Sequence, residues 1–214
     1  MEAVSFLLLL TGSISVLSLL LLHFTSPEFD PGWRMISEYA LGKYKWLLTI
    51  FFVCWGTCSL LSALLLWAEV SGFWSTLGIL CLILTGIGAI MGGLFDVKHK
   101  LHGMAFGIGI PFMPAGALLI SYHLIKSERW GHAQFSILAS AHAIWISVVL
   151  MGITMALLFS GFRKAGIAFG PDIAPPEKLP PGVIGINGYF NRLLVLCYLT
   201  WPMLMAYIYC CYKS

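Results

Sequence analysis

Six long apolar stretches constrain this chain more than any other feature of its sequence. A helix needs about 20 apolar residues to cross the hydrocarbon core of a bilayer, and each stretch reaches that length. None of them alternates apolar and polar residues as the strands of a membrane β-barrel do, and a helix satisfies its own backbone hydrogen bonds inside a bilayer. We therefore predict an all-α polytopic integral membrane protein, a six-transmembrane-helix bundle in which residues 1–214 form a single domain. The predicted spans are residues 3–24, 46–68, 73–95, 103–125, 134–161 and 189–211.

The composition agrees with this class and excludes several others. Hydrophobic residues make up 59% of the chain and charged residues only 10%, whereas a soluble domain is about 45–50% apolar and about 25% charged. A soluble enzyme, a disordered chain, a coiled coil and a disulfide scaffold are therefore excluded. The net charge is +3 and no long basic run is present, so we expect no nucleic-acid partner. Membrane lipids are the expected partners, and no cofactor is predicted.

Two connections between the spans are long. Residues 25–45 contain acidic, basic and aromatic residues, and we expect an interfacial helix around Met35–Leu41. Residues 162–188 contain five prolines, which exclude a continuous helix. This second connection is either a lid or a stiff linker.

The distribution of positive charges predicts an orientation. Six spans place both termini on one face of the membrane, here called the terminal side. The opposite face, here called the loop side, receives the connections after the first, third and fifth spans and carries eight Lys and Arg residues against three on the terminal side. Because cytoplasmic loops are enriched in Lys and Arg, we expect a protein of the cytoplasmic membrane with extracytoplasmic termini. The loop-side residues are Arg34, Lys43, Lys45, Lys98, Lys100, Arg163, Lys164 and Lys178, and the terminal-side residues are Lys126, Arg129 and Lys213.

Small residues predict one close pair of helices. Gly88 and Gly92 end the third span, and Gly103 and Gly107 begin the fourth after a short turn. Glycines four residues apart let helix backbones approach closely, so we expect these glycines to pack the two spans together. Two prolines, at positions 111 and 114, predict a kink in the fourth span.

Polar side chains in or beside membrane helices are costly, and here most of them gather on the loop side. Arg192 is the most expensive, because it stands inside the sixth span. It can reach the surface, pair with Glu38 or Asp96, or hold a lipid phosphate. The loop-side residues are His23, Glu38, Asp96, His99, His102, Asn191 and Arg192.

Several catalytic or metal-binding interpretations of these residues remain open. Asp96, His99 and His102 are of the types that bind zinc, although the same residues can cap a helix or face lipid headgroups, and no metal is predicted. Ser37, beside Glu38, could act as a nucleophile with His102 or His99 as its base. His142, inside the fifth span, either hydrogen-bonds a neighbouring helix or lines a cavity. A haem would need facing histidine pairs, and only His142 with His23 or His102 offers one.

Residues 29–39, which read Phe-Asp-Pro-Gly-Trp-Arg-Met-Ile-Ser-Glu-Tyr, carry a family resemblance. They resemble the P-G-y … I-S-E-L-G pattern of the domain of unknown function 998, a mainly bacterial six-span family, although Tyr39-Ala40 replaces the usual Leu-Gly. The resemblance implies a six-helix bundle with a polar site on one face. That family looks distantly similar to the Frag/DRAM-like membrane proteins, some of which are linked to membrane lipid handling. The resemblance continues at Asp96, at His102-Gly103 and at Asn191-Arg192-Leu193.

These observations lead to one main functional hypothesis and two alternatives. The main hypothesis is a loop-side pocket that binds a lipid headgroup or another amphiphile. The first alternative is an intramembrane hydrolase or transferase that uses Asp96 and His102, with or without a metal. The second is a transporter of small solutes or protons that uses His142 and the prolines of the fourth span. The residues expected to form the pocket are Ser37, Glu38, Asp96, His102, His142, Asn191 and Arg192.

Overall fold

The computed structural model of the chain is a bundle of long helices, and it describes residues 1–95, 99–168 and 176–211. No strand occurs within these ranges. Three short helical turns, η1 (Ile36–Leu41), η2 (Trp67–Glu69) and α5 (Glu128–Gly131), lie in the connections. The predicted all-α six-span architecture is therefore confirmed, and the expected interfacial helix is the turn η1. The long helices are α1 (Glu2–Thr25), α2 (Lys45–Leu66), α3 (Phe73–Leu94), α4 (Lys100–Leu124), α6 (Gln134–Lys164) and α7 (Asn187–Cys211).

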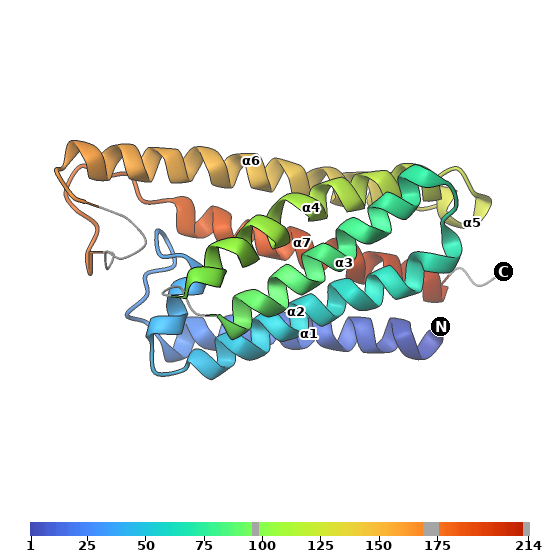
Figure 1. Ribbon diagram of the computed structural model, residues 1–214, viewed down its shortest axis with the longest axis horizontal. Coiled ribbons are helices and arrows are strands. Elements are labelled where there is room, and N and C mark those ends of the chain that lie inside the picture. The colour runs from blue at the N-terminus through green and yellow to red at the C-terminus, as the bar shows by residue number, and fades with distance from the viewer. Residues whose placement is uncertain (96–98, 169–175, 212–214) are drawn as a thin grey trace.

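Each of these six helices is long and apolar enough to cross a membrane. Helix α6 is the longest, with 31 residues, or about 46 Å at 1.5 Å per residue. The hydrocarbon core is only about 30 Å thick, so α6 is longer than the core. It also extends beyond its neighbours on the loop side (Figure 1). The start of α1 and the end of α7 lie together at the opposite end of the bundle, as an even number of spans requires.

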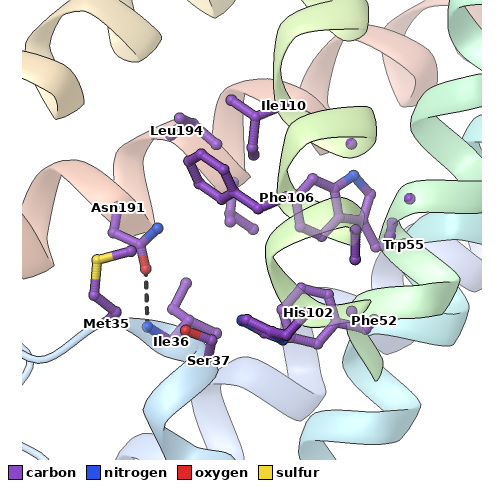
Figure 2. Close-up of a pocket in the computed structure, with 16 residues that line it drawn as sticks. Met35, Ile36, Ser37, Phe52, Trp55, His102, Phe106, Ile110, Asn191 and Leu194 are labelled. Atoms are coloured by element: carbon purple, nitrogen blue, oxygen red, sulfur yellow. Dashed lines mark hydrogen bonds between the residues drawn. The ribbon is translucent and has the colours of Figure 1, made fainter. Parts of the chain in front are cut away.

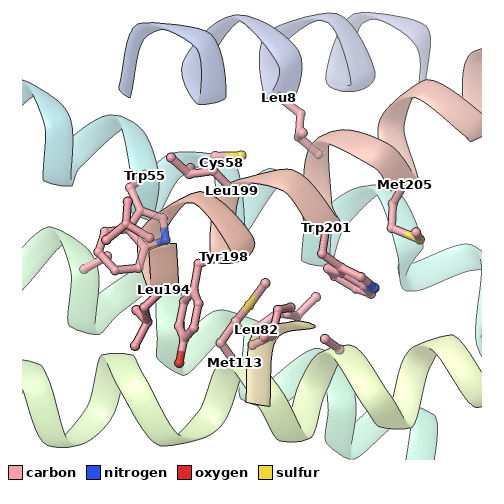
Figure 3. Packing of buried hydrophobic residues seen from close by; sticks show 14 of the residues in the cluster. Leu8, Trp55, Cys58, Leu82, Met113, Leu194, Tyr198, Leu199, Trp201 and Met205 are labelled. Carbon is pink, nitrogen blue, oxygen red and sulfur yellow. The ribbon is translucent and has the colours of Figure 1, made fainter. Parts of the chain in front are cut away.

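The helices α1 to α4 pack in sequence order, each against the next, and α7 packs against α1, α2 and α6. Large side chains of α7 fill the centre of the bundle: Tyr198 and Trp201 are fully buried, and the ring of Tyr198 lies against Trp55 of α2 (Figure 3). Only the loop-side half of α7 takes part in the candidate site described below. The core thus fixes the helix that carries Asn191 and Arg192.

Close packing of α3 against α4 is observed, but most of the predicted glycines do not make the contact. A side chain on Gly88 would overlap the backbone of Gly109, and one on Gly116 would come within 2.9 Å of the Gly78 carbonyl. Gly103 has no atom within 4 Å of an added side chain. The same holds for Gly107, while Gly92 faces only the ring of Phe52. The prediction chose the right helices and one correct glycine. Helix α4 meets Gly88 through Ala105 and Gly109, so Gly103 and Gly107 lie on a different face of α4 that points into open space.

One of the two prolines of α4 explains a hydrogen bond between α4 and α7. Proline has no amide hydrogen, so Pro114 leaves the carbonyl of Ile110 without its helical partner. The hydroxyl of Tyr198, from α7, donates a hydrogen bond to that carbonyl. This bond joins α4 to α7 near the middle of the bundle.

Candidate functional site

The loop that contains η1 is fastened to the start of α7 by backbone contacts. The amide of Gly188 donates to the carbonyl of Gly32 at 2.9 Å, and the side-chain amide of Asn187 donates to the carbonyl of Trp33 at 2.8 Å. A side chain at position 188 would overlap the carbonyl of Pro31. Glycine at this position therefore lets the loop lie directly on the helix.

Arg192 is buried in this contact, with 9% of its surface exposed. Its guanidinium donates to the carbonyls of Arg34 and Gly188 at 2.7 and 2.9 Å. It also donates to the hydroxyl of Tyr39 at 3.2 Å and to Nε2 of His23 at 2.7 Å. Nδ1 of His23 lies 2.6 Å from the carbonyl of Leu19 and must carry the ring hydrogen, which leaves Nε2 as an acceptor.

A second arginine joins the same network. Nε of Arg34 lies 2.6 Å from a carboxylate oxygen of Glu38, and its Nη1 donates to the carbonyl of Pro176 at 2.8 Å. The other oxygen of Glu38 accepts from the amide of Met35 at 2.8 Å. Burial raises the pKa of the Glu38 carboxyl above its ordinary value, and the Met35 amide and the Arg34 guanidinium oppose this shift. We call His23, Arg34, Glu38, Tyr39, Asn187 and Arg192 the anchor network.

Beside the anchor network, a small pocket of about 70 Å³ lies between η1, α2, α3, α4 and α7. Figure 2 shows it from close by, with side chains of η1 and α7 on one side and of α2 and α4 on the other. Its walls are mostly apolar, and three polar side chains belong to the lining: Ser37, His102 and Asn191. The larger apolar side chains of the lining are Met35, Phe52, Trp55, Phe106, Ile110 and Leu194.

The polar side chains of the pocket keep unused hydrogen-bonding capacity. Nδ1 of His102 lies 2.9 Å from the carbonyl of Phe95 and must carry the ring hydrogen, so Nε2 is an acceptor in the neutral ring. Oδ1 of Asn191 accepts from the amide of Ile36 at 2.8 Å, which leaves its amide hydrogens as donors. Ser37 and His102 lie at the same end of the pocket (Figure 2). Within the described ranges, no residue hydrogen-bonds to Nε2 of His102, Nδ2 of Asn191 or the Ser37 hydroxyl.

The predicted site residues thus separate into groups. Ser37, His102 and Asn191 come together at the pocket, whereas Glu38 and Arg192 belong to the anchor network, where Arg34 connects them. The four hydrogen-bond partners of Arg192 are neutral groups of the protein, and Glu38 is not among them.

The remaining candidates lie elsewhere. Asp96 lies outside the described residues. His99 begins α4, where its ring accepts from the amide of Leu101 and stacks on Phe95. His142 is in the terminal-side half of α6, away from the pocket. Its Nδ1 accepts from Trp145 at 2.8 Å, and its Nε2 lies 3.1 Å from the Tyr122 hydroxyl.

No group of three or more His, Cys, Asp or Glu residues is placed to hold a metal ion in the part of the chain that the structure describes. One of the three candidate zinc ligands, Asp96, lies outside the described residues. For His99 and His102, the described contacts are the helix cap and the Phe95 carbonyl.

Sequence reasoning missed several functional residues. Tyr39 and Asn187 have no distinguishing signal in the sequence, because a tyrosine in a loop and an asparagine before a span are common. Trp55 and Phe106 look like any aromatic residue of a membrane span. Arg34 could have been found, because it stands four residues before Glu38, the spacing of an ion pair on a helical turn.

The comparisons with known proteins place the chain in a family. A search of curated proteins and a search of solved structures each found no match. The family model described as "Protein of unknown function (DUF998)" matches residues 9–207, which include all but the ends of the bundle. The more distant similarity to Frag/DRAM-like proteins stays a prediction. Because the match covers nearly the whole chain, from α1 to α7, this protein belongs to the DUF998 family of membrane proteins.

Proposed function

We propose that this protein binds a lipid headgroup or another amphiphile in the loop-side pocket. The observation that carries the proposal is the composition of the pocket: apolar walls with three polar side chains that retain hydrogen-bonding capacity. Ligand pockets are typically lined by apolar side chains with a few placed polar groups. An amphiphile matches both parts of this lining.

The position of the pocket supports an amphiphile over a water-soluble ligand. Ser37 and His102 lie near the loop side, whereas Ile110 lies deeper in the bundle, where Tyr198 bonds its carbonyl. A ligand can therefore place its polar group toward the loops and its chain toward the membrane centre.

One wall of the pocket borders the lipid. Phe106 lines the pocket and is 55% exposed. An added side chain on either of its glycine neighbours in α4, Gly103 and Gly107, would meet no atom within 4 Å. The exposed surface of a membrane-spanning helix faces acyl chains, so a lipid can approach the pocket from within the bilayer beside α4.

The proposal is tested by measuring the lipid that co-purifies with the protein. Gly92 lines the pocket, and a single added carbon there makes ordinary contact with the Phe52 ring at 3.5 Å. We expect Gly92→Leu to fill the pocket and lose the bound lipid detected by native mass spectrometry. Gly92→Ala is the matched control and should retain it. Equal lipid in all three proteins would contradict the proposal.

A second function is favoured by one specific observation, the presence of Ser37 and His102 in the lining of the same pocket (Figure 2). His102 is held by the Phe95 carbonyl with Nε2 as an acceptor, the state a general base requires. In an acyl hydrolase or transferase, Nε2 would take the Ser37 proton as the hydroxyl attacks an ester carbonyl, and would return it to the alcohol that leaves as the ester bond breaks. Water or a second alcohol would then release the acyl group from Ser37. Release of nitrophenol from 4-nitrophenyl octanoate, abolished by Ser37→Ala, would support this function. An unchanged rate in Ser37→Ala would exclude it.

We also propose that the loop side faces the cytoplasm in the cytoplasmic membrane. Support comes from its eight Lys and Arg residues, against three on the terminal side. A phosphatase that is active only after export, fused to the C-terminus, should therefore be active. A silent phosphatase together with a fluorescent C-terminal reporter would reverse the assignment.

A further inference from the structure

The residues that face the pocket indicate the chemistry of the polar group that binds there. Among the described residues, no Lys, Arg, Asp or Glu lines the pocket. The two buried arginines on the same membrane face, Arg34 and Arg192, are held by Glu38 and by neutral groups of the anchor network. A charged headgroup in the pocket would therefore find no counter-ion among the described lining residues, and burying an unpaired charge is strongly unfavourable.

The pocket offers more donors than acceptors. The hydroxyl of Ser37 and the amide hydrogens of Asn191 can donate to a ligand. An acceptor oxygen of a ligand would complete the hydrogen bonding of these donors.

Nε2 of His102 is the complementary acceptor. Because Nδ1 carries the ring hydrogen toward the Phe95 carbonyl, the neutral ring can receive a hydroxyl proton of a ligand at Nε2. Donors and one acceptor thus lie in the same small volume, without a fixed charge among the described lining residues.

We infer that the ligand is an uncharged amphiphile whose polar group carries both an acceptor oxygen and a hydroxyl, as an acylglycerol does. This inference rests on the proposed function, because it specifies the class of amphiphile that the same pocket takes. An ester carbonyl matches the donors of Ser37 and Asn191, and a glycerol hydroxyl matches Nε2 of His102.

The experiment compares three probes that share an oleyl-type chain and differ in charge: monooleoylglycerol, oleoyl lysophosphatidic acid and oleylamine. Each is titrated into the protein in nanodiscs while tryptophan fluorescence is recorded, and Gly92→Leu corrects for partition into the bilayer. We expect monooleoylglycerol to bind at least tenfold more tightly than either charged probe. Ser37→Ala should weaken it by about threefold to tenfold, the effect of one lost hydrogen bond.

A change of selectivity provides the sharper result. His102→Lys replaces the acceptor with a fixed cation, so the preference should move at least tenfold toward lysophosphatidic acid. Equal binding of the three probes to the original protein, or tighter binding of a charged one, would overturn the inference while the amphiphile pocket stands, provided that Gly92→Leu abolishes the signal. Failure of all three probes to bind would overturn the proposed function as well.

Discussion

The anchor network and the pocket lie side by side on one membrane face, and both include residues of η1 and α7. They differ in how far their polar atoms are hydrogen-bonded within the protein. In the anchor network, the guanidinium of Arg192 has four protein partners. In the pocket, His102 and Asn191 each use one polar atom on the protein and present another. Asn191 is a pocket residue that also fastens the η1 loop, because its side-chain oxygen accepts a hydrogen bond from the amide of Ile36.

This difference separates structural polarity from polarity that can bind a ligand. A buried polar group that is fully hydrogen-bonded stabilises one conformation, and its removal leaves its partners without hydrogen bonds. A group with remaining capacity gains less from the fold and can exchange its bond with water for one with a ligand. Cost alone therefore does not identify a binding residue: Arg192 is the most expensive side chain of the spans, and it holds the loop.

The largest expected effect follows from removing the centre of the anchor network. Arg192→Ala leaves Nε2 of His23, the carbonyl of Arg34 and the hydroxyl of Tyr39 without the donor that they have in the folded protein, at about 1–3 kcal/mol each. We expect a loss of at least about 3 kcal/mol in the free energy of unfolding, measured by thermal denaturation in detergent. Arg192→Lys, which keeps the charge but not the planar fork, should lose less. Normal stability with lost lipid binding would instead make Arg192 a ligand contact and erase the distinction between the two regions.

The part of the pocket wall where α3 packs against α4 should also contribute to stability. The contrast with the anchor network therefore applies only to the polar end of the pocket. A methyl group on Gly88 overlaps the backbone of Gly109, so Gly88→Ala should destabilise the protein by about 1–3 kcal/mol, the usual cost of overpacking. Gly107→Ala is the matched control on the facing helix, because an added carbon there has no neighbour within 4 Å. Equal melting temperatures for the two variants would mean that α3 and α4 can separate freely.

The sequence predicted the fold far better than the site, for a physical reason. Membrane spans are set by the length and hydrophobicity of continuous segments, which are local properties. The partner of Arg192 depends on how α1, η1 and α7 meet, and His23 lies 169 residues away from it along the chain. Polar residues of one membrane face could be grouped from topology alone. Their division into an anchor network and a pocket required the direction of each side chain, which topology does not contain.

His142 is a different case, because the sequence contained the information that places it away from the pocket. Its position inside a span indicated either a hydrogen bond or a cavity, and the structure shows bonds to Tyr122 and Trp145. Counting residues along the span places it nearer the terminal side than the loop side, a signal that the sequence did contain.

Changes at the polar end of the pocket should affect binding more than stability. Ser37 has no hydrogen bond to lose within the described chain, so Ser37→Ala should change the free energy of unfolding by no more than about 0.5 kcal/mol, as is usual for partly exposed sites. The amount of co-purified lipid should nevertheless fall. His102→Phe tests the same point with the ring shape retained. Strong destabilisation by both substitutions would show that the pocket residues contribute to stability as the anchor network does.

The smallest expected effect concerns Glu38, the carboxyl of the anchor network. Burial raises its pKa in the folded protein above the ordinary value of 4.5, so the folded state binds more protons than the unfolded state between these two values. Stability from this group therefore increases as the pH falls from above the raised pKa toward 4.5, and is lost as the pH rises. We expect the difference in melting temperature between the original protein and Glu38→Gln to shift in favour of the original protein over that interval. Glu38→Gln removes only this titration, so other acidic and histidine groups cancel in the difference. A shift in the opposite direction would mean that the ion pair with Arg34 outweighs burial, and the anchor network would then depend on charge at Glu38 as well as on the hydrogen bonds of Arg192.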